Sequence, residues 1–203
     1  RDLNRRYDTP MSDARRDRMR RRFQQELRAL QEVPFDDLGR DGRIDWLLLE
    51  NHVRRELHAL SEEQRRDREL QSLLPFAPDI VALAEARRDL QDIDAEKVAA
   101  IVDGIARSTW SIHASVQRGD FNSTPPPLRE RAARQLSDLR RSMSNWFRYR
   151  DGYDPQFSWW VRTPHQDADR AIESLGKALR APSRGESNVD RTLIGDPVGL
   201  DAL

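Results

Sequence analysis

Apolar residues recur three and four positions apart along nearly the whole chain, and no useful length of it alternates apolar and polar residues as a strand would. The clearest stripe follows three consecutive prolines. It consists of Leu128, Ala132, Leu136, Leu139, Met143 and Phe147. This spacing brings one side chain per turn onto one face of a helix, where it can be buried. The sequence therefore predicts an all-α fold, an antiparallel bundle-like array of about six to seven helices.

Start and stop signals divide these stripes into separate helices. Either Thr9-Pro10 or Ser12 is expected to begin the first helix, and Asp94 is expected to cap a later one. Gly119 and Gly152 are plausible stops, because glycine readily takes the left-handed conformation that ends many helices.

Two further starts are expected inside longer apolar patterns. Ser61-Glu62-Glu63-Gln64 has the form of a capping box, so a new helix or a kink is predicted there. Thr163-Pro164 repeats the combination of a capping residue and a proline, and predicts a helix that begins after the aromatic stretch.

The chain is expected to be a single helical domain over residues 1–203, with one helical half over 1–92 and a second over 93–182. Residues 183–203 are expected to form a loop and the start of another element, because Asp201-Ala202-Leu203 resembles the first turn of a helix. This pattern indicates the amino-terminal part of a larger helical protein.

Charge argues against a nucleic-acid partner. The chain has 35 basic and 35 acidic residues, so its formal net charge is zero, whereas nucleic-acid binding needs an excess of positive charge on one face. The densest basic run, Arg15–Arg22, is interpreted as a solvated helix face with ion pairs. No stretch approaches the roughly 20 apolar residues of a membrane span.

Catalytic and metal-binding patterns are weak. There is no cysteine, and the histidines do not form an H-E-x-x-H pair. His52 and Glu56 can share a helix face, but His58 lies on another, so an ion pair on a solvated helix is the simpler interpretation. No catalytic, cofactor-binding or metal-binding residue is predicted in this chain, although a hydrolase that uses His52, Glu56 and another acid stays open as an alternative.

Large aromatic residues concentrate in one region that includes the connection Tyr153–Pro164. The candidates for a docking or ligand-facing surface are Trp146, Tyr149, Tyr153, Phe157, Trp159 and Trp160, with Arg148, Arg150 and Arg162 beside them. These aromatics can fill the end of a bundle, line a cleft, or form a patch that another piece of polypeptide covers. Composition alone does not separate the three.

Three segments resemble the domain-of-unknown-function 885 family. They are Asp41–Leu49 (DGRIDWLLL), Phe147–Pro155 (FRYRDGYDP) with the adjoining Phe157–Val161, and Ile194–Gly199 (IGDPVG). Members of that family are bacterial, mostly helical and often exported or lipid-anchored. Their later part carries an H-E-x-x-P-G-H segment typical of a zinc-dependent peptidase. This sequence has no such segment, so no metal ligand or catalytic residue can be transferred to it.

The resemblance implies a non-catalytic amino-terminal helical domain. It would help to shape the cleft of a metallopeptidase-like protein and dock on a carboxy-terminal catalytic part through Tyr153–Val161. Zinc would belong to that other part, and a periplasmic or secreted location is favoured over a cytoplasmic one. The alternative is a self-contained helical module that binds a peptide or a small apolar ligand through the same aromatic patch.

Overall fold

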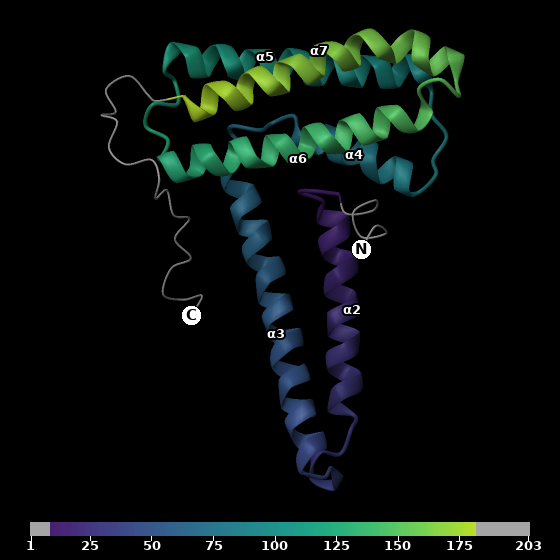
Figure 1. The fold of residues 1–203 in the computed structure, drawn as a ribbon, viewed down its shortest axis with the longest axis vertical. Helices are drawn as coiled ribbons and strands as arrows, with labels where there is room; N and C mark the ends of the chain where they lie inside the picture. The colour runs from purple at the N-terminus through teal and green to yellow at the C-terminus, as the bar shows by residue number, and fades with distance from the viewer. Residues whose placement is uncertain (1–8, 182–203) are drawn as a thin grey trace. The chain divides into compact units, whose positions relative to one another are not determined.

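The protein is all-α, as predicted. A computed structural model describes residues 9–181, and within that range it contains six α-helices, one short 3-10 turn and no strand (Figure 1). The elements are α2 (Asp13–Gln31), η1 (Phe35–Asp37), α3 (Arg40–Glu69), α4 (Ala77–Arg88), α5 (Ala95–Arg118), α6 (Pro126–Arg150) and α7 (Pro155–Arg180). No helix in this range is long and apolar enough to cross a membrane.

The chain divides into two compact units, Arg1–Glu69 (unit 1) and Leu70–Leu203 (unit 2). The expected halves met at 92/93, but α4 groups with the helices that come after it. The reason is that α4 packs against α6, and Leu70, Leu73 and Phe76 in the segment before α4 are almost fully buried. The element predicted at 183–203 lies outside the described residues, as does the Ile194–Gly199 motif.

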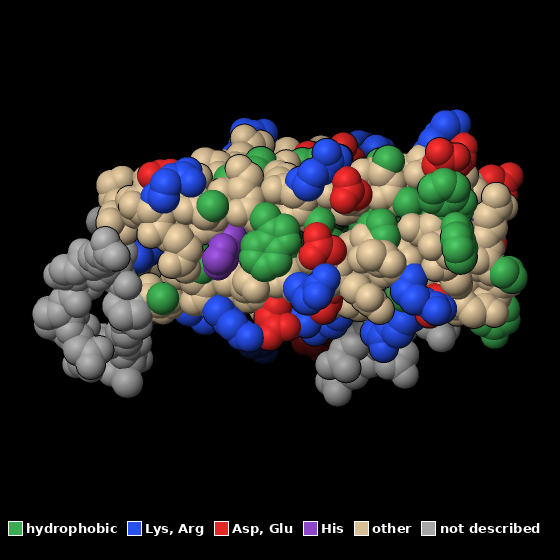
Figure 2. Space-filling view, turned by 90° about the horizontal axis from the view of Figure 1, so that it is seen from above, with side chains coloured by type: hydrophobic (Ala, Val, Ile, Leu, Met, Phe, Trp, Pro, Cys, Tyr) green, Lys and Arg blue, Asp and Glu red, His purple; other side chains and the backbone are tan. Residues whose placement is uncertain are grey.

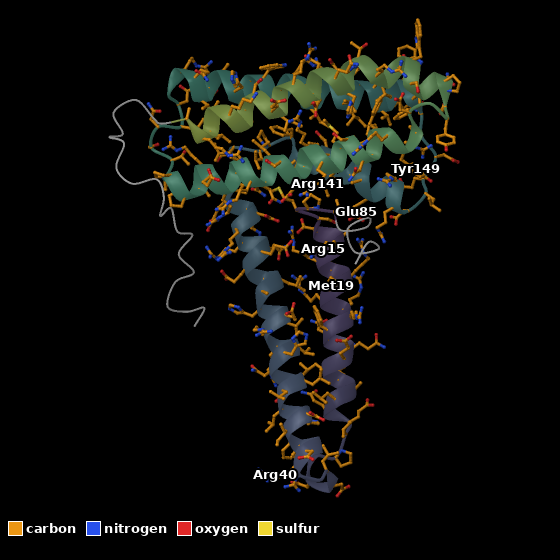
Figure 3. All side chains as sticks on the ribbon, in the orientation of Figure 1. Arg15, Met19, Arg40, Glu85, Arg141 and Tyr149 are labelled. Atoms are coloured by element: carbon orange, nitrogen blue, oxygen red, sulfur yellow. The ribbon has the colours of Figure 1, made fainter. Side chains whose placement is uncertain are left out.

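Unit 1 is a helical hairpin of α2 and α3 (Figure 1). Ser12 caps the N-terminus of α2, because its hydroxyl accepts a hydrogen bond from the backbone N–H of Arg15 at 2.9 Å. Phe23, Val53 and Leu60 form a small buried cluster between the helices. Met19 packs against this cluster from α2, whereas Arg40 marks the start of α3 at the other end of the hairpin (Figure 3).

Arginine ion pairs hold the open end of this hairpin together. Arg16, only 3% exposed, donates hydrogen bonds to Asp13 at 2.8 Å and to Asp67 at 2.5 Å, and it also reaches Glu63. Arg15 donates to the same Glu63. The interpretation of Arg15–Arg22 as a solvated, ion-paired face is therefore wrong for Arg16, which is buried among carboxylates.

The capping box predicted at Ser61–Gln64 does not begin a helix, because α3 continues through it to Glu69. The Ser61 hydroxyl donates to the carbonyl of Leu57, four residues earlier, instead of accepting from the next turn. Leu57 and Leu60 continue one apolar face toward α2, so tertiary packing favours an uninterrupted helix over the local signal.

Unit 2 is a bundle built on three long helices. α6 and α7 form an antiparallel hairpin, and α5 lies beside α7 and runs in the same direction (Figure 1). The largest fully buried side chains include Ile105, Leu136, Leu139, Met143 and Ile172. The stripe predicted for residues 128–147 thus supplies much of the core.

An ion pair joins the middles of α6 and α7, and a left-handed glycine follows each of α5 and α6. Arg140 of α6 donates to both carboxylate oxygens of Asp169 on α7, at 2.6 and 2.8 Å, and this contact holds the pKa of Asp169 below its ordinary value. Gly119 and Gly152 come after α5 and α6 with φ of 91° and 88°, so both predicted stops are confirmed. Asp94 caps α5 by accepting from the N–H of Lys97.

Candidate docking surface

The aromatic stretch is the first turns of α7 and not a connection. α7 begins at Pro155, and the carboxylate of Asp154 caps it by accepting a hydrogen bond from the N–H of Phe157 at 3.0 Å. Pro164 lies inside the helix, so the start predicted at Thr163-Pro164 is wrong. The Asp154-Pro155 pair supplies the same kind of signal nine residues earlier.

Helix geometry then separates these aromatics into two sets. Successive residues are about 100° apart around a helix. Phe157 and Val161 therefore face the core and are 0% exposed, whereas Trp159 lies on the opposite side and is 81% exposed. The exposed set is Tyr149, Tyr153, Trp159 and Trp160, which we call the aromatic end of unit 2.

Two of the predicted surface candidates are core residues. Trp146 and Phe157 are buried and meet edge to face, with ring centroids 5.4 Å apart, and Phe157 also contacts Phe147. A helix that starts at Pro155 turns Phe157 inward onto the last turns of α6. These two residues are therefore not available to a ligand or partner in this structure.

A network of hydrogen bonds locks the turn between α6 and α7. Ser158 donates to Asp151 at 2.8 Å and accepts from the backbone N–H of Gly152 at 3.1 Å. Arg162 donates to the same carboxylate at 2.9 Å. The hydrogen bonds from Arg162 and Ser158 hold the pKa of Asp151 below its ordinary value.

The three flanking arginines bond within their own chain. Arg162 is neutralised by its ion pair with Asp151. Arg148 donates to Asn145 at 2.8 Å and to the carbonyl of Ser144, and Arg150 donates to the carbonyl of Gln91 at 2.9 Å. Because amides and carbonyls are neutral, Arg148 and Arg150 keep their positive charge for a partner.

The last turn of α4 and the connection that follows it also reach this end, which the sequence did not indicate. The guanidinium of Arg87 lies over the ring of Tyr149, 4.7 Å from its centroid, and Tyr149 is found at the end of α6 (Figure 3). In the sequence, Ile80, Val81, Leu83 and Leu90 together suggest a short helix. Instead Leu90 lies beyond α4, is largely exposed and has a φ of 53°.

Seen from above, most of the surface of unit 2 mixes charges of both signs (Figure 2). Hydrophobic side chains gather toward the end where α7 begins. An exposed group of large aromatics on an otherwise charged surface is typical of a site that another molecule covers.

Within residues 9–181, the histidines and carboxylates form no metal site. His52 Nδ1 lies 3.9 Å from Glu56 on the exposed side of α3, the i,i+4 pair expected from the sequence. Across residues 9–181, no three potential ligands among His, Asp and Glu come close enough to hold a metal ion.

His165 is the one histidine of the described chain that stacks on a buried aromatic ring, with its centroid 4.1 Å from that of Phe147. Its Nε2 is buried without a hydrogen-bond partner. Burial lowers the pKa of His165, and Asp169 and Asp151 oppose the effect only in part.

We expect unit 2 to lose stability as the pH falls below about 6.5, because the unfolded chain then binds a proton that folded His165 resists. One such group contributes at most about 1.4 kcal/mol per pH unit. His165→Phe keeps a ring against Phe147 and removes the titration. We would measure the free energy of unfolding in urea at several pH values between about 5 and 7. In the variant this free energy should change less steeply with pH than in the parent. The same pH dependence in the parent and the variant would contradict the prediction, because it would show that His165 has the same pKa in the folded and unfolded chains.

No family model, no curated protein and no solved structure matches the chain.

Proposed function

We propose that the chain is a non-catalytic helical module whose aromatic end docks on another polypeptide, the carboxy-terminal catalytic part of a metallopeptidase-like protein. The observation that supports this most is the position of Trp159. It points away from the core, is 81% exposed, and sits one turn after a capped and hydrogen-bonded helix start. Tryptophan and tyrosine contribute a large share of the binding energy at protein interfaces.

The choice of a polypeptide partner rests on the shape and chemistry of this end. Tyr153, Trp159 and Trp160 project from a helix start and its preceding turn, and each combines apolar area with one polar atom. Arg148 and Arg150 add uncompensated positive charge beside them. A protein surface with apolar side chains and a few carboxylates would complement this end. The identity of that surface as a catalytic part rests on the family resemblance alone.

A self-contained peptide-binding module is the second candidate. It is favoured by the core of unit 2, in which Trp146, Phe157 and Leu136 are almost fully buried. A unit that already buries its core does not need another domain in order to fold. The two candidates share one surface and differ in what covers it.

Calorimetric titration tests the proposal. We expect the chain to bind the polypeptide that its gene encodes after residue 203, and Trp159→Ala to weaken that binding by about 30-fold, which corresponds to roughly 2 kcal/mol. Ile101→Ala removes an exposed apolar side chain on α5 and serves as the matched control, with an expected change below about twofold. The stability of Trp159→Ala should stay within about 0.5 kcal/mol of the parent.

Two results would contradict the first candidate. One is equal binding by the parent and Trp159→Ala. The other is a gene that continues without an H-E-x-x-P-G-H segment, or that stops at residue 203. In that second case, binding of free apolar peptides by the isolated chain, lost in Trp159→Ala, would support the peptide-binding module.

A further inference from the structure

α3 has a second apolar face that nothing in unit 1 covers. Val53 and Leu60 face α2, whereas Ile44, Leu47 and Leu48 lie on the other side of the same helix. All three are exposed, and Leu48 is the most exposed at 63%. This face belongs to unit 1, so it is independent of the aromatic end of unit 2.

Opposite charges stand at equal distances on either side of this patch. Asp41 precedes Leu48 by seven residues and Arg55 comes seven residues after it, which places all three on one stripe of the helix. Asp41 and Arg55 are both exposed, and among the described residues neither makes an ion pair. Nearby Arg54 and Arg43, by contrast, are bonded within their own chain.

We propose that this face pairs with the same face of a second copy of the chain. A two-fold axis beside Leu48 would bring two α3 helices together in antiparallel orientation. Leu48 would meet its counterpart, Ile44 and Leu47 would pack around that contact, and Asp41 would lie level with Arg55 of the other copy. Asp41 and Arg55 each lie seven residues from Leu48, about 10 Å along the helix at 1.5 Å per residue. The same antiparallel arrangement therefore forms both symmetry-related Asp41–Arg55 ion pairs.

The charge order is what favours a second copy over an unrelated partner. An acid before the apolar centre and a base after it make the stripe complementary to itself only when the second helix runs the opposite way. The patch is small. Three apolar side chains of one helix form it, so we expect a weaker pairing than that of a standard interface of roughly 800 Å² per partner, with a Kd of about 10–100 μM.

Sedimentation velocity on the full chain tests this pairing. The mass should rise from the 23.7 kDa monomer toward the dimer as concentration increases from about 5 to 500 μM. Leu48→Glu should abolish the rise. Ile101→Glu, a matched change at an exposed site on α5, should leave it unchanged. Circular dichroism of each variant confirms that the helices are intact.

Charge reversal tests the antiparallel register. Asp41→Arg and Arg55→Asp should each weaken association about tenfold or more, and the double variant should recover most of it, because both pairs re-form with their charges exchanged. A monomer at every concentration would overturn the proposal and leave the patch to another partner. Association that survives Leu48→Glu would overturn it as well. So would a double variant that associates as weakly as Asp41→Arg or Arg55→Asp alone. None of these outcomes depends on Trp159, so failure here leaves the proposed function standing.

Discussion

Phe157→Ala is expected to lower the free energy of unfolding of unit 2 by about 3–5 kcal/mol. The ring is fully buried and meets Trp146 and Phe147 at the start of the α6–α7 hairpin. Its removal loses the burial of a large aromatic side chain and leaves a cavity that two rigid helices cannot close. Urea denaturation monitored by circular dichroism would measure the loss.

Trp159→Ala is the matched control, two residues further along the same helix. It removes a larger side chain but creates no cavity, so the free energy of unfolding should change by no more than about 0.5 kcal/mol. Similar losses in the two variants would mean that the phase of α7 differs from the one described, and the aromatic end would then have to be defined again.

Arg16→Ala is expected to destabilise the α2–α3 hairpin by about 3 kcal/mol. Arg16 is buried, and among the described residues it is the only ion-pair partner of Asp67, so the variant leaves a half-buried carboxylate uncompensated. Burial already raises the pKa of Asp67 despite that pairing. Hydrogen exchange read by mass spectrometry should show faster exchange in α2 and α3 than in unit 2.

Two further variants separate the loss of this pair from a general loss of charge. Arg22→Ala breaks an exposed pair with Glu26 and should cost at most about 1 kcal/mol. Arg16→Met combined with Asp67→Leu removes both charges and should recover most of the stability. If Arg22→Ala destabilises the hairpin as much as Arg16→Ala does, the burial of Arg16 does not explain its contribution to stability.

Much of the fold could be predicted because helix signals in this chain are strong and local. The stripe from Leu128 to Phe147, the cap at Asp94 and the stops at Gly119 and Gly152 are each set by residues within a few turns. Two of the expected helix starts were wrong because packing overrides the local signal. Ser61 and Thr163-Pro164 carry start signals, but long apolar faces continue through both and packing keeps the helices unbroken.

The candidate surface was harder to predict because exposure depends on the phase of one helix. Taken as a connection, Tyr153–Pro164 gave no reason to separate Phe157 from Trp159. Once α7 starts at Pro155, the inward and outward residues are set by helix geometry. The burial of Arg16 could not be predicted either, since it depends on carboxylates about 50 residues away in the sequence.

The hydrogen-bonded turn at Asp151, Gly152 and Ser158 has a consequence for how this chain would bind. Its backbone is already held in one conformation, so a partner that covers Trp159 has little main-chain freedom left to freeze. The entropy lost on this side of the complex would come mainly from stiff aromatic side chains. Differences in affinity between partners should therefore reflect how ordered each partner is before it arrives.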